Sequence, residues 1–225
     1  FESKGRVRPV ERCPPRYIIE EMEKLTVADF KKMLDTAMKN ISAREEEFSK
    51  LDAVTGDGDH GTAIVTALTA VCEGAQNGTE FKQMLNDMGF NVMMKTSGST
   101  STLLGGFFLG MSDNAAGEEL DASGVKAMFK GGVEGVKKNT KAMPGDKTMM
   151  DSLVPAVDAI CSCGSDDIKE IMNAGAKAAL AGAEATVNMK ANFGRARNYG
   201  EKSIGYADSG ATSWACMFES FAQAL

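Results

Sequence analysis

The chain has 225 residues, 43% of them hydrophobic, and this length fits one domain with a full core better than two. Aspartate and glutamate outnumber lysine and arginine by 31 to 25, which excludes the broad basic surface typical of nucleic-acid-binding proteins. The longest charge-free stretch, residues 96–112, is rich in glycine and shorter than the roughly 20 apolar residues of a membrane-spanning helix. We therefore expect no nucleic-acid partner and no membrane span.

The first segment, residues 1–21, carries five basic side chains around three prolines and shows no amphipathic repeat that could bury a face. We expect an irregular N-terminal extension over residues 1–21 and a folded domain over residues 22–225. The sequence does not distinguish a natural extension from a transit-peptide remnant or a cloning artefact.

From Thr26 onward, apolar residues recur at helical spacing in eight stripes. The first runs from Val27 to Ile41, and Thr26 with Asp29 has the spacing of a capping box. The other stripes begin at Ile64, Phe81, Leu104, Val125, Leu153, Ile168 and Trp214. No alternation of period two reaches strand length, and glycines and polar caps separate the stripes. We therefore predict an all-α domain, a bundle of eight antiparallel amphipathic helices.

Between the first two stripes, LDAVTGDGDHGT (51–62) concentrates three aspartates, three glycines and the only histidine. It is not a Rossmann fingerprint, because an acidic helix pattern precedes it in place of a buried strand, and it is not a P-loop, because the lysine before Thr62 is absent. An EF-hand would need an acidic residue twelve positions into the loop, and counting from Asp57 reaches Leu68.

The three aspartates of this turn suit a metal ion. Asp57 and Asp59 lie two residues apart, so an extended backbone points both to one side, and Asp52 approaches from the end of the preceding helix. Such carboxylates repel one another unless cations such as Mg²⁺ neutralise them. The alternative is an ordinary turn in which Asp59 caps the helix that begins near Gly61. The residues alone leave both interpretations open.

The next polar stretch, TSGSTSTLLGGFF (96–108), places small hydroxyl side chains directly before a helix. A helix N-terminus offers unpaired N–H groups and the positive end of the dipole, so Ser99 and Thr100 could cradle a phosphate. The alternative is a Ser/Thr cap followed by tight helix packing at Gly105 and Gly106.

Two later segments complete the pattern. Thr148 and Asp151 have capping-box spacing and predict a helix start, and the long aromatic and basic loop 191–210 is typical of a lid. An acidic cluster and a phosphate cradle are complementary parts of a Mg-nucleotide site, which such a lid could cover.

The five cysteines are an odd number, and no secretory signal precedes them, so we expect reduced thiols and a cytoplasmic location. Cys161 and Cys163 lack a second cysteine pair and a nearby histidine, and no metal site is predicted for them.

Four stretches together resemble the nucleotide-binding L subunit of dihydroxyacetone kinases and the equivalent domain of the single-chain kinases. They are LDAVTGDGDHG (51–61), SGSTSTLLGGFF (97–108), PGDKTMMDSLVPAV (144–157) and ATVNMKANFGRARNYGEKSIGYADSGATS (185–213). The resemblance implies a barrel of eight antiparallel helices with a nucleotide, ADP or ATP, and two Mg²⁺ ions in the loops at one end. The chain departs from the family at Tyr206, often histidine, and at Ser209, which replaces the proline of Asp-Pro-Gly.

The resemblance also implies roles for single residues. The metal ligands would be Asp52, Asp57 and Asp59, and no side chain would act as a covalent catalyst. Nucleotide contacts toward the phosphates would be His60, Gly61, Thr62, Ala63, Ser99 and Thr100, and contacts around the adenine would be Thr140, Met149, Arg195, Asp208, Ser209 and Gly210. Thr140 stands where the family often has a glycine. For His60, a shaping role is favoured over that of a phosphate carrier.

As a member of this family the chain would be a phosphotransferase, passing phosphate from Mg-bound nucleotide to a triose held by a separate K-type subunit, and inactive alone. Resident ADP, rephosphorylated by an M-type subunit of the phosphotransferase system, is favoured over exchangeable ATP. The alternatives are an ATP-using kinase domain for another small sugar, a fatty-acid kinase domain, a non-catalytic nucleotide-loaded regulator and a metal-dependent phosphohydrolase. The sequence does not identify the acceptor sugar, and it does not decide whether the chain forms a homodimer.

Overall fold

The computed structural model describes residues 23–225, so the extension expected over residues 1–21 lies outside the described residues. Within residues 23–225 there are nine α-helices, two 3-10 helices and two short strands. The elements are, in chain order, β1 Lys24–Thr26, α1 Val27–Ala43, α2 Glu45–Thr55, α3 His60–Ala75, α4 Phe81–Lys95, α5 Ser99–Ser112, β2 Glu119–Asp121, α6 Ala122–Lys137, α7 Met150–Ser162, α8 Ile168–Ala185, η1 Thr186–Asn188, η2 Arg195–Ser203 and α9 Ser209–Gln223.

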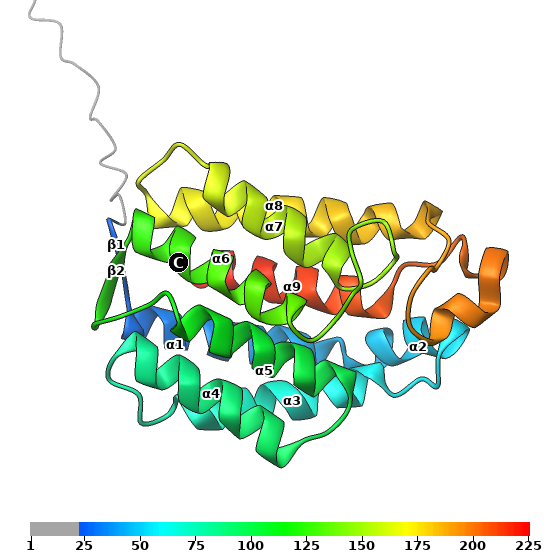
Figure 1. Cartoon of the computed structure of the whole chain (residues 1–225), viewed down its shortest axis with the longest axis horizontal. Coiled ribbons are helices and arrows are strands. Elements are labelled where there is room, and N and C mark those ends of the chain that lie inside the picture. Colours follow the sequence, from blue (N-terminus) through cyan, green and yellow to red (C-terminus); the bar gives the residue numbers. More distant parts are fainter. Residues whose placement is uncertain (1–22) are drawn as a thin grey trace, which may run out of the picture.

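Eight of these helices form a closed ring. From α3 to α9 each packs against the next, and α1 packs against both α3 and α9. Consecutive helices of the ring run in opposite directions along the long axis of the molecule (Figure 1). The prediction of an all-α barrel of eight antiparallel helices is therefore confirmed. Within residues 23–225 no helix combines the length and the apolar character needed to cross a membrane.

The ninth helix, α2, extends the barrel at one end. The chain breaks at Arg44, whose φ of −111° and ψ of 12° separate α1 from α2, and the Arg44 guanidinium lies over the ring of Phe48, 5.1 Å from its centroid. Phe48 is the only buried residue of α2. Because one buried residue makes no stripe, the sequence did not show α2 as a separate element.

The strands were not predicted either. Each has three residues, and they pair antiparallel with Leu25 opposite Leu120. The capping box before α1 is present, since Thr26 Oγ1 accepts from Asp29 N at 3.1 Å and the Asp29 carboxylate accepts from Thr26 N at 3.3 Å. The start of α1 thus depends on both local capping and pairing with a distant strand.

Aromatic rings join the helices in the core. Phe107 on α5 lies 5.1 Å from Trp214 on α9 and 6.3 Å from Phe129 on α6, and Phe129 in turn lies 5.9 Å from Phe218. These edge-on and tilted contacts are favourable geometries for aromatic pairs. Because α9 contributes two of these rings, the ring network fixes the position of α9 inside the barrel.

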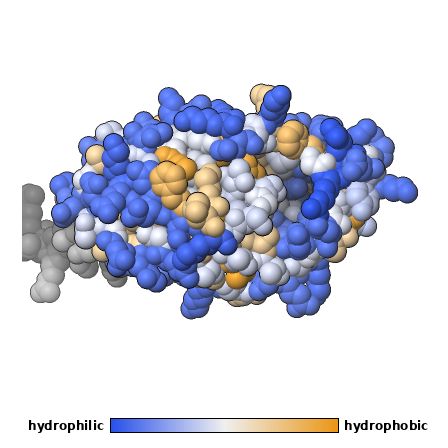
Figure 2. Space-filling view, turned by 60° about the horizontal axis from the view of Figure 1, so that its bottom comes forward, coloured by the Kyte–Doolittle hydropathy of each residue, from blue (hydrophilic) through white to orange (hydrophobic). Residues whose placement is uncertain are grey.

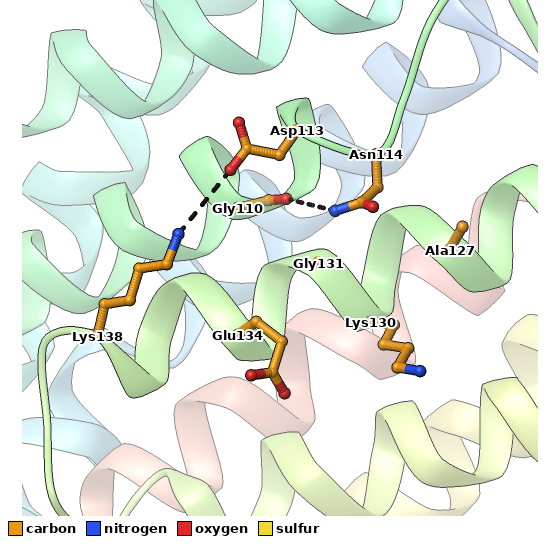
Figure 3. A pocket seen from close by; sticks show the side chains of 8 residues that line it. All are labelled: Gly110, Asp113, Asn114, Ala127, Lys130, Gly131, Glu134 and Lys138. Atoms are coloured by element: carbon orange, nitrogen blue, oxygen red, sulfur yellow. Dashed lines mark hydrogen bonds and ion pairs between the residues drawn. The ribbon is translucent and has the colours of Figure 1, made fainter.

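Glycines bring α5 and α6 into close contact. A Cβ atom on Gly110 would overlap the carbonyl oxygen of Gly131, and one on Gly135 would overlap that of Gly106. Figure 3 shows the surface hollow of about 400 Å³ that borders this contact, where Asn114 Nδ2 donates to Gly110 O at 3.4 Å. None of the residues selected from the sequence as nucleotide or metal contacts lines this hollow.

The outer surface is mostly polar. On the face turned forward in Figure 2, hydrophobic side chains form small separate patches among hydrophilic ones. The exposed hydrophobic residues include Phe90 and Met94 on α4. This distribution agrees with helices whose apolar stripes face the core.

Several helices of the barrel have their N-termini at the same end of the molecule. The helices α3, α5, α7 and α9 all begin at this end, beside α2 and the segment that contains η2 (Figure 1). Four helix N-termini carry the positive ends of their dipoles to the same place. Anionic groups are therefore favoured there.

Candidate metal and nucleotide site

The three aspartates of the turn between α2 and α3 lie together. Asp52 is in the last turn of α2, Asp57 is in the turn, and Asp59 stands at the N-cap position of α3. One carboxylate oxygen from each lies within 4.8 Å of the others. We call these three residues the acidic trio. Three convergent carboxylates are a donor set that suits a hard divalent cation such as Mg²⁺.

Glycine is required twice in this turn. Gly58 has a φ of +78°, and its N–H donates to Asp52 Oδ2 at 2.8 Å. A Cβ atom on Gly56 would lie 2.6 Å from Asp52 Oδ1. The glycines therefore let the backbone pass close to Asp52, and the bond from Gly58 orients its carboxylate.

Asp59 does not act as a helix cap. It occupies the N-cap position of α3, yet its side chain makes no capping hydrogen bond, and it is exposed. Because a capping aspartate would accept from the N–H groups of the first turn, the simple capping interpretation does not describe this residue. Its carboxylate is available to a cation.

The segment around η2 reaches the trio through Arg195. The guanidinium of Arg195 forms an ion pair with the carboxylate of Asp57. The predicted lid thus touches the acidic trio through a cationic side chain. The segment that contains η2 packs against α2, and Figure 1 shows this segment in orange beside α2 at the end of the barrel.

The start of α9 lies against the same group. The Asp208 carboxylate accepts from Ala211 N at 2.7 Å and caps α9, and the Ser209 hydroxyl donates to Asp52 Oδ1 at 3.3 Å. A Cβ atom on Gly210 would lie 3.4 Å from Cβ of Met149, which is buried. The serine at 209 therefore links α9 to the trio, a contact that proline could not make.

Burial raises the pKa of Asp208 to about 7, against the opposing effects of its bond to Ala211 N and of the nearby Lys147. The carboxylates of Asp151 and Asp52 raise it further. A cation bound at the trio would favour the charged form of Asp208, because opposite charge lowers the pKa of a carboxyl.

His60 joins α3 to α9. Its Nε2 lies 2.9 Å from Ser213 Oγ, and this hydroxyl donates to Gly210 O at 3.0 Å. Since the serine proton is used in that bond, Nε2 is the ring nitrogen that donates. Burial lowers the pKa of His60, although the Asp52 carboxylate opposes this, and the shift favours the neutral imidazole. These contacts support the shaping role that the sequence favoured.

Other selected residues take part in packing. Gly61 is buried where a Cβ atom would overlap Glu45 O, and Thr62 Oγ1 donates to Glu45 Oε1 at 2.9 Å. Ala63 N donates to Asp59 O at 2.9 Å within the first turn of α3. Gly61 and Thr62 thus hold α2 against α3, and any phosphate contact here would use backbone groups.

The structure places Ser99 and Thr100 in the first turn of α5, at the end where the trio lies (Figure 1). They follow Gly98, with a φ of +94°, and no side chain caps this helix. The Ser/Thr cap, which was the alternative to a phosphate cradle, is therefore absent from α5. Among residues 23–225 no hydrogen bond joins Ser99 or Thr100 to the trio. Thr140 lies between α6 and α7, where its hydroxyl accepts from Ala142 N at 3.1 Å.

The sequence did not indicate Lys147 or Ser213 at this end, and it indicated Asp151 only as part of a capping box. Asp151 accepts from Gly145 N at 2.5 Å and from Thr148 N at 2.8 Å, so it fixes the turn before α7. Ser213 lies one helical turn beyond Ser209 and is the partner of the only histidine. Because Ser213 follows Ser209 by one helical turn, the two side chains lie on the same face of α9, and this spacing could have indicated that Ser213 lies beside the site.

Comparison with known proteins identifies relatives of this chain. The family model described as the DAK2 domain matches residues 54–223. The ADP-binding subunit DhaL of PEP-dependent dihydroxyacetone kinase 1 from Listeria innocua is 32% identical over 188 residues, which cover 82% of this chain and 90% of that protein. The corresponding DhaL subunit of Escherichia coli is 32% identical over 194 residues, with the same coverage of 82% and 90%.

Longer proteins match as well. Human triokinase/FMN cyclase is 31% identical over 202 residues, which cover 86% of this chain and 34% of that protein. The crystal structure of the dihydroxyacetone kinase of C. freundii in its native form superposes with a TM-score of 0.67 at 21% identity, covering 98% of this chain and 39% of that chain. At this identity the superposition shows a shared fold.

Proposed function

Because the chain belongs to the DAK2 domain family, we propose that it is the nucleotide-binding phosphotransfer subunit of a dihydroxyacetone kinase. It binds a Mg-nucleotide and passes phosphate to dihydroxyacetone or a similar small ketose held by a separate K-type subunit. The observation that carries this proposal is the meeting of Asp52, Asp57 and Asp59 where α3 and α9 begin. The nucleotide- and Mg-binding domain is proposed to run over residues 22–225.

In this proposal the chain works by positioning, because phosphoryl transfer needs in-line alignment and charge stabilisation more than covalent chemistry. Asp52, Asp57 and Asp59 hold two Mg²⁺ ions. Mg²⁺ bound there supplies positive charge to the oxygens of the transferred phosphoryl group. The uncapped N-terminus of α5, at Ser99 and Thr100, offers backbone N–H groups to the phosphates.

The remaining contacts hold the nucleotide and limit its exchange. Met149 and Gly210 form one wall of the adenine pocket, with Thr140, Asp208 and Ser209 nearby, and Arg195 helps to close this pocket. Two bacterial relatives are named as ADP-binding subunits of PEP-dependent kinases, which supports ADP as a resident cofactor. An M-type phosphotransferase-system protein would then rephosphorylate ADP in place, and a nucleotide that stays bound during dialysis is the expected sign.

Reconstitution tests the proposed function. The full chain is mixed with a K-type sugar-binding subunit, dihydroxyacetone, Mg²⁺ and either ATP or PEP with the phosphotransferase-system proteins, and formation of dihydroxyacetone phosphate is followed. We expect turnover only when both subunits are present, and its complete loss when EDTA removes the metal. The chain alone serves as the control.

Two outcomes would contradict the proposal. Absence of turnover with every K-type partner, while Mg-nucleotide still binds, would favour a nucleotide-loaded regulator. Steady release of inorganic phosphate without an acceptor would instead favour a phosphohydrolase.

A further inference from the structure

Lys147 combines two unusual properties. It is buried, with 2% of its surface exposed, and within residues 23–225 it is the only residue other than glycine with a positive φ, at +59°. Long charged side chains are seldom buried, and the left-handed region favours glycine. A residue held in a rare backbone conformation by its surroundings is a reason to look for a role in function.

The ammonium of Lys147 joins two distant parts of the chain. Nζ donates to Thr186 O at 2.7 Å and to Tyr206 O at 2.5 Å. These carbonyls stand near the two ends of residues 186–208, which we call the closing segment. Two further bonds bring its ends together, from Gly205 N to Val187 O at 2.8 Å and from Asp208 N to Thr186 Oγ1 at 2.9 Å.

Two residues, one within the closing segment and one directly after it, contact the acidic trio. Within the closing segment, Arg195 forms the ion pair with Asp57. Directly after it, Ser209 donates to Asp52 at 3.3 Å. The positions of both side chains over the trio therefore depend on how the two ends of the segment are held.

Burial is the largest influence on the charge of Lys147, and two nearby carboxylates oppose it only in part. Burial lowers the pKa of Lys147, and the carboxylates of Asp208 and Asp151 raise it. Asp151 also accepts from Thr148 N at 2.8 Å and so fixes the turn that contains Lys147. If this position served only the turn, glycine would suit its backbone better. The presence of lysine at this position therefore indicates a role for its side chain.

We propose that Lys147 is a positioning residue of the nucleotide site, whose ammonium ties together the two ends of the closing segment and thereby holds Arg195 and Ser209 at the acidic trio. This inference rests on the proposed function, which it deepens by naming what keeps the bound nucleotide enclosed. Loss of the ammonium leaves two carbonyl groups without their charged donor, and hydrogen bonds to charged groups are the stronger ones.

The test compares Lys147→Gly and Lys147→Met with the native chain. Lys147→Gly removes the ammonium but suits the positive φ, so it separates the side chain from the turn. Lys126→Met is the matched control, because Lys126 Nζ also donates to two carbonyls, of Cys163 at 2.7 Å and Ser165 at 3.2 Å, where α7 ends rather than where it begins.

Two measurements are made on each full-length variant. The first is amide hydrogen exchange of residues 186–208 in the nucleotide-free protein. The second is the dissociation rate of a fluorescent ADP analogue in the presence of Mg²⁺. For both Lys147 variants we expect exchange and dissociation to be faster by about tenfold or more, and Lys126→Met should leave both unchanged.

Native rates of exchange or of dissociation in Lys147→Gly would overturn the inference. If Lys147→Met does not fold, Lys147→Gly still decides, because its backbone is relieved. If the native chain binds no Mg-ADP, the proposed function fails, and the hydrogen exchange still shows whether Lys147 holds the closing segment.

Discussion

Asp59→Asn is expected to lower the affinity for Mg-ADP by about 100-fold or more, because it removes one of three converging charges while keeping the shape of the side chain. Asp59 is exposed and makes no capping bond, so its replacement breaks no hydrogen bond that supports α3. The metal-free variant should therefore melt within about 1 °C of the native chain or slightly above it, since the remaining carboxylates repel each other less. Isothermal titration with ADP and Mg²⁺ measures the loss.

Asp113→Asn is the control for this prediction. It removes the same charge from an exposed aspartate directly after α5, whose weak contact is an Nζ to Oδ2 distance of 4.0 Å from Lys138. Its affinity for Mg-ADP should equal that of the native chain. Native affinity in Asp59→Asn would show that the acidic trio does not hold the nucleotide through a metal.

Gly135→Ala should destabilise the fold by about 2–3 kcal/mol, because the new methyl group would overlap the carbonyl oxygen of Gly106 and push α5 away from α6. The better helix propensity of alanine, about 1 kcal/mol, opposes only part of this cost. For a chain of this length the melting temperature should fall by roughly 4–12 °C. Urea denaturation gives the free energy of unfolding directly.

Gly164→Ala provides the comparison, since a Cβ atom at Gly164 meets nothing within 4 Å. This variant should stay within about 0.5 kcal/mol of the native chain. Equal stability of Gly135→Ala and Gly164→Ala would mean that the close approach of α5 and α6 contributes nothing specific to the barrel.

The barrel could be predicted because each of its helices carries apolar residues at helical spacing, and this pattern lies within one continuous stretch of sequence. The stripes that include Phe107, Phe129 and Phe218 are buried as expected, and these rings meet in the core. Helix α2 was not counted because Phe48 is its only buried residue. The strands were missed because three residues are too few for a pattern, and the pairing of Leu25 with Leu120 joins distant parts of the chain.

In the candidate site, too, the local features could be predicted from the sequence and the contacts between distant residues could not. The convergence of Asp52, Asp57 and Asp59 follows from spacing and glycines within one turn, and the structure brings them together. The partners that orient this turn come from far away, since Ser213 lies 153 residues beyond His60. No local pattern shows such a contact. Lysine side chains are usually exposed, so the burial of Lys147 could not be predicted from its residue type and is seen only in the tertiary structure.

In the proposed function the acidic trio holds divalent cations that bind a nucleotide. A crystal structure of the full chain grown with Mn²⁺ and ADP tests it directly, because the anomalous signal of Mn²⁺ locates each ion. We predict anomalous peaks about 2.1 Å from carboxylate oxygens of Asp52, Asp57 and Asp59, with the diphosphate between them and the start of α5. A nucleotide bound elsewhere, or a trio without an ion at saturating Mn²⁺ and ADP, would contradict the account.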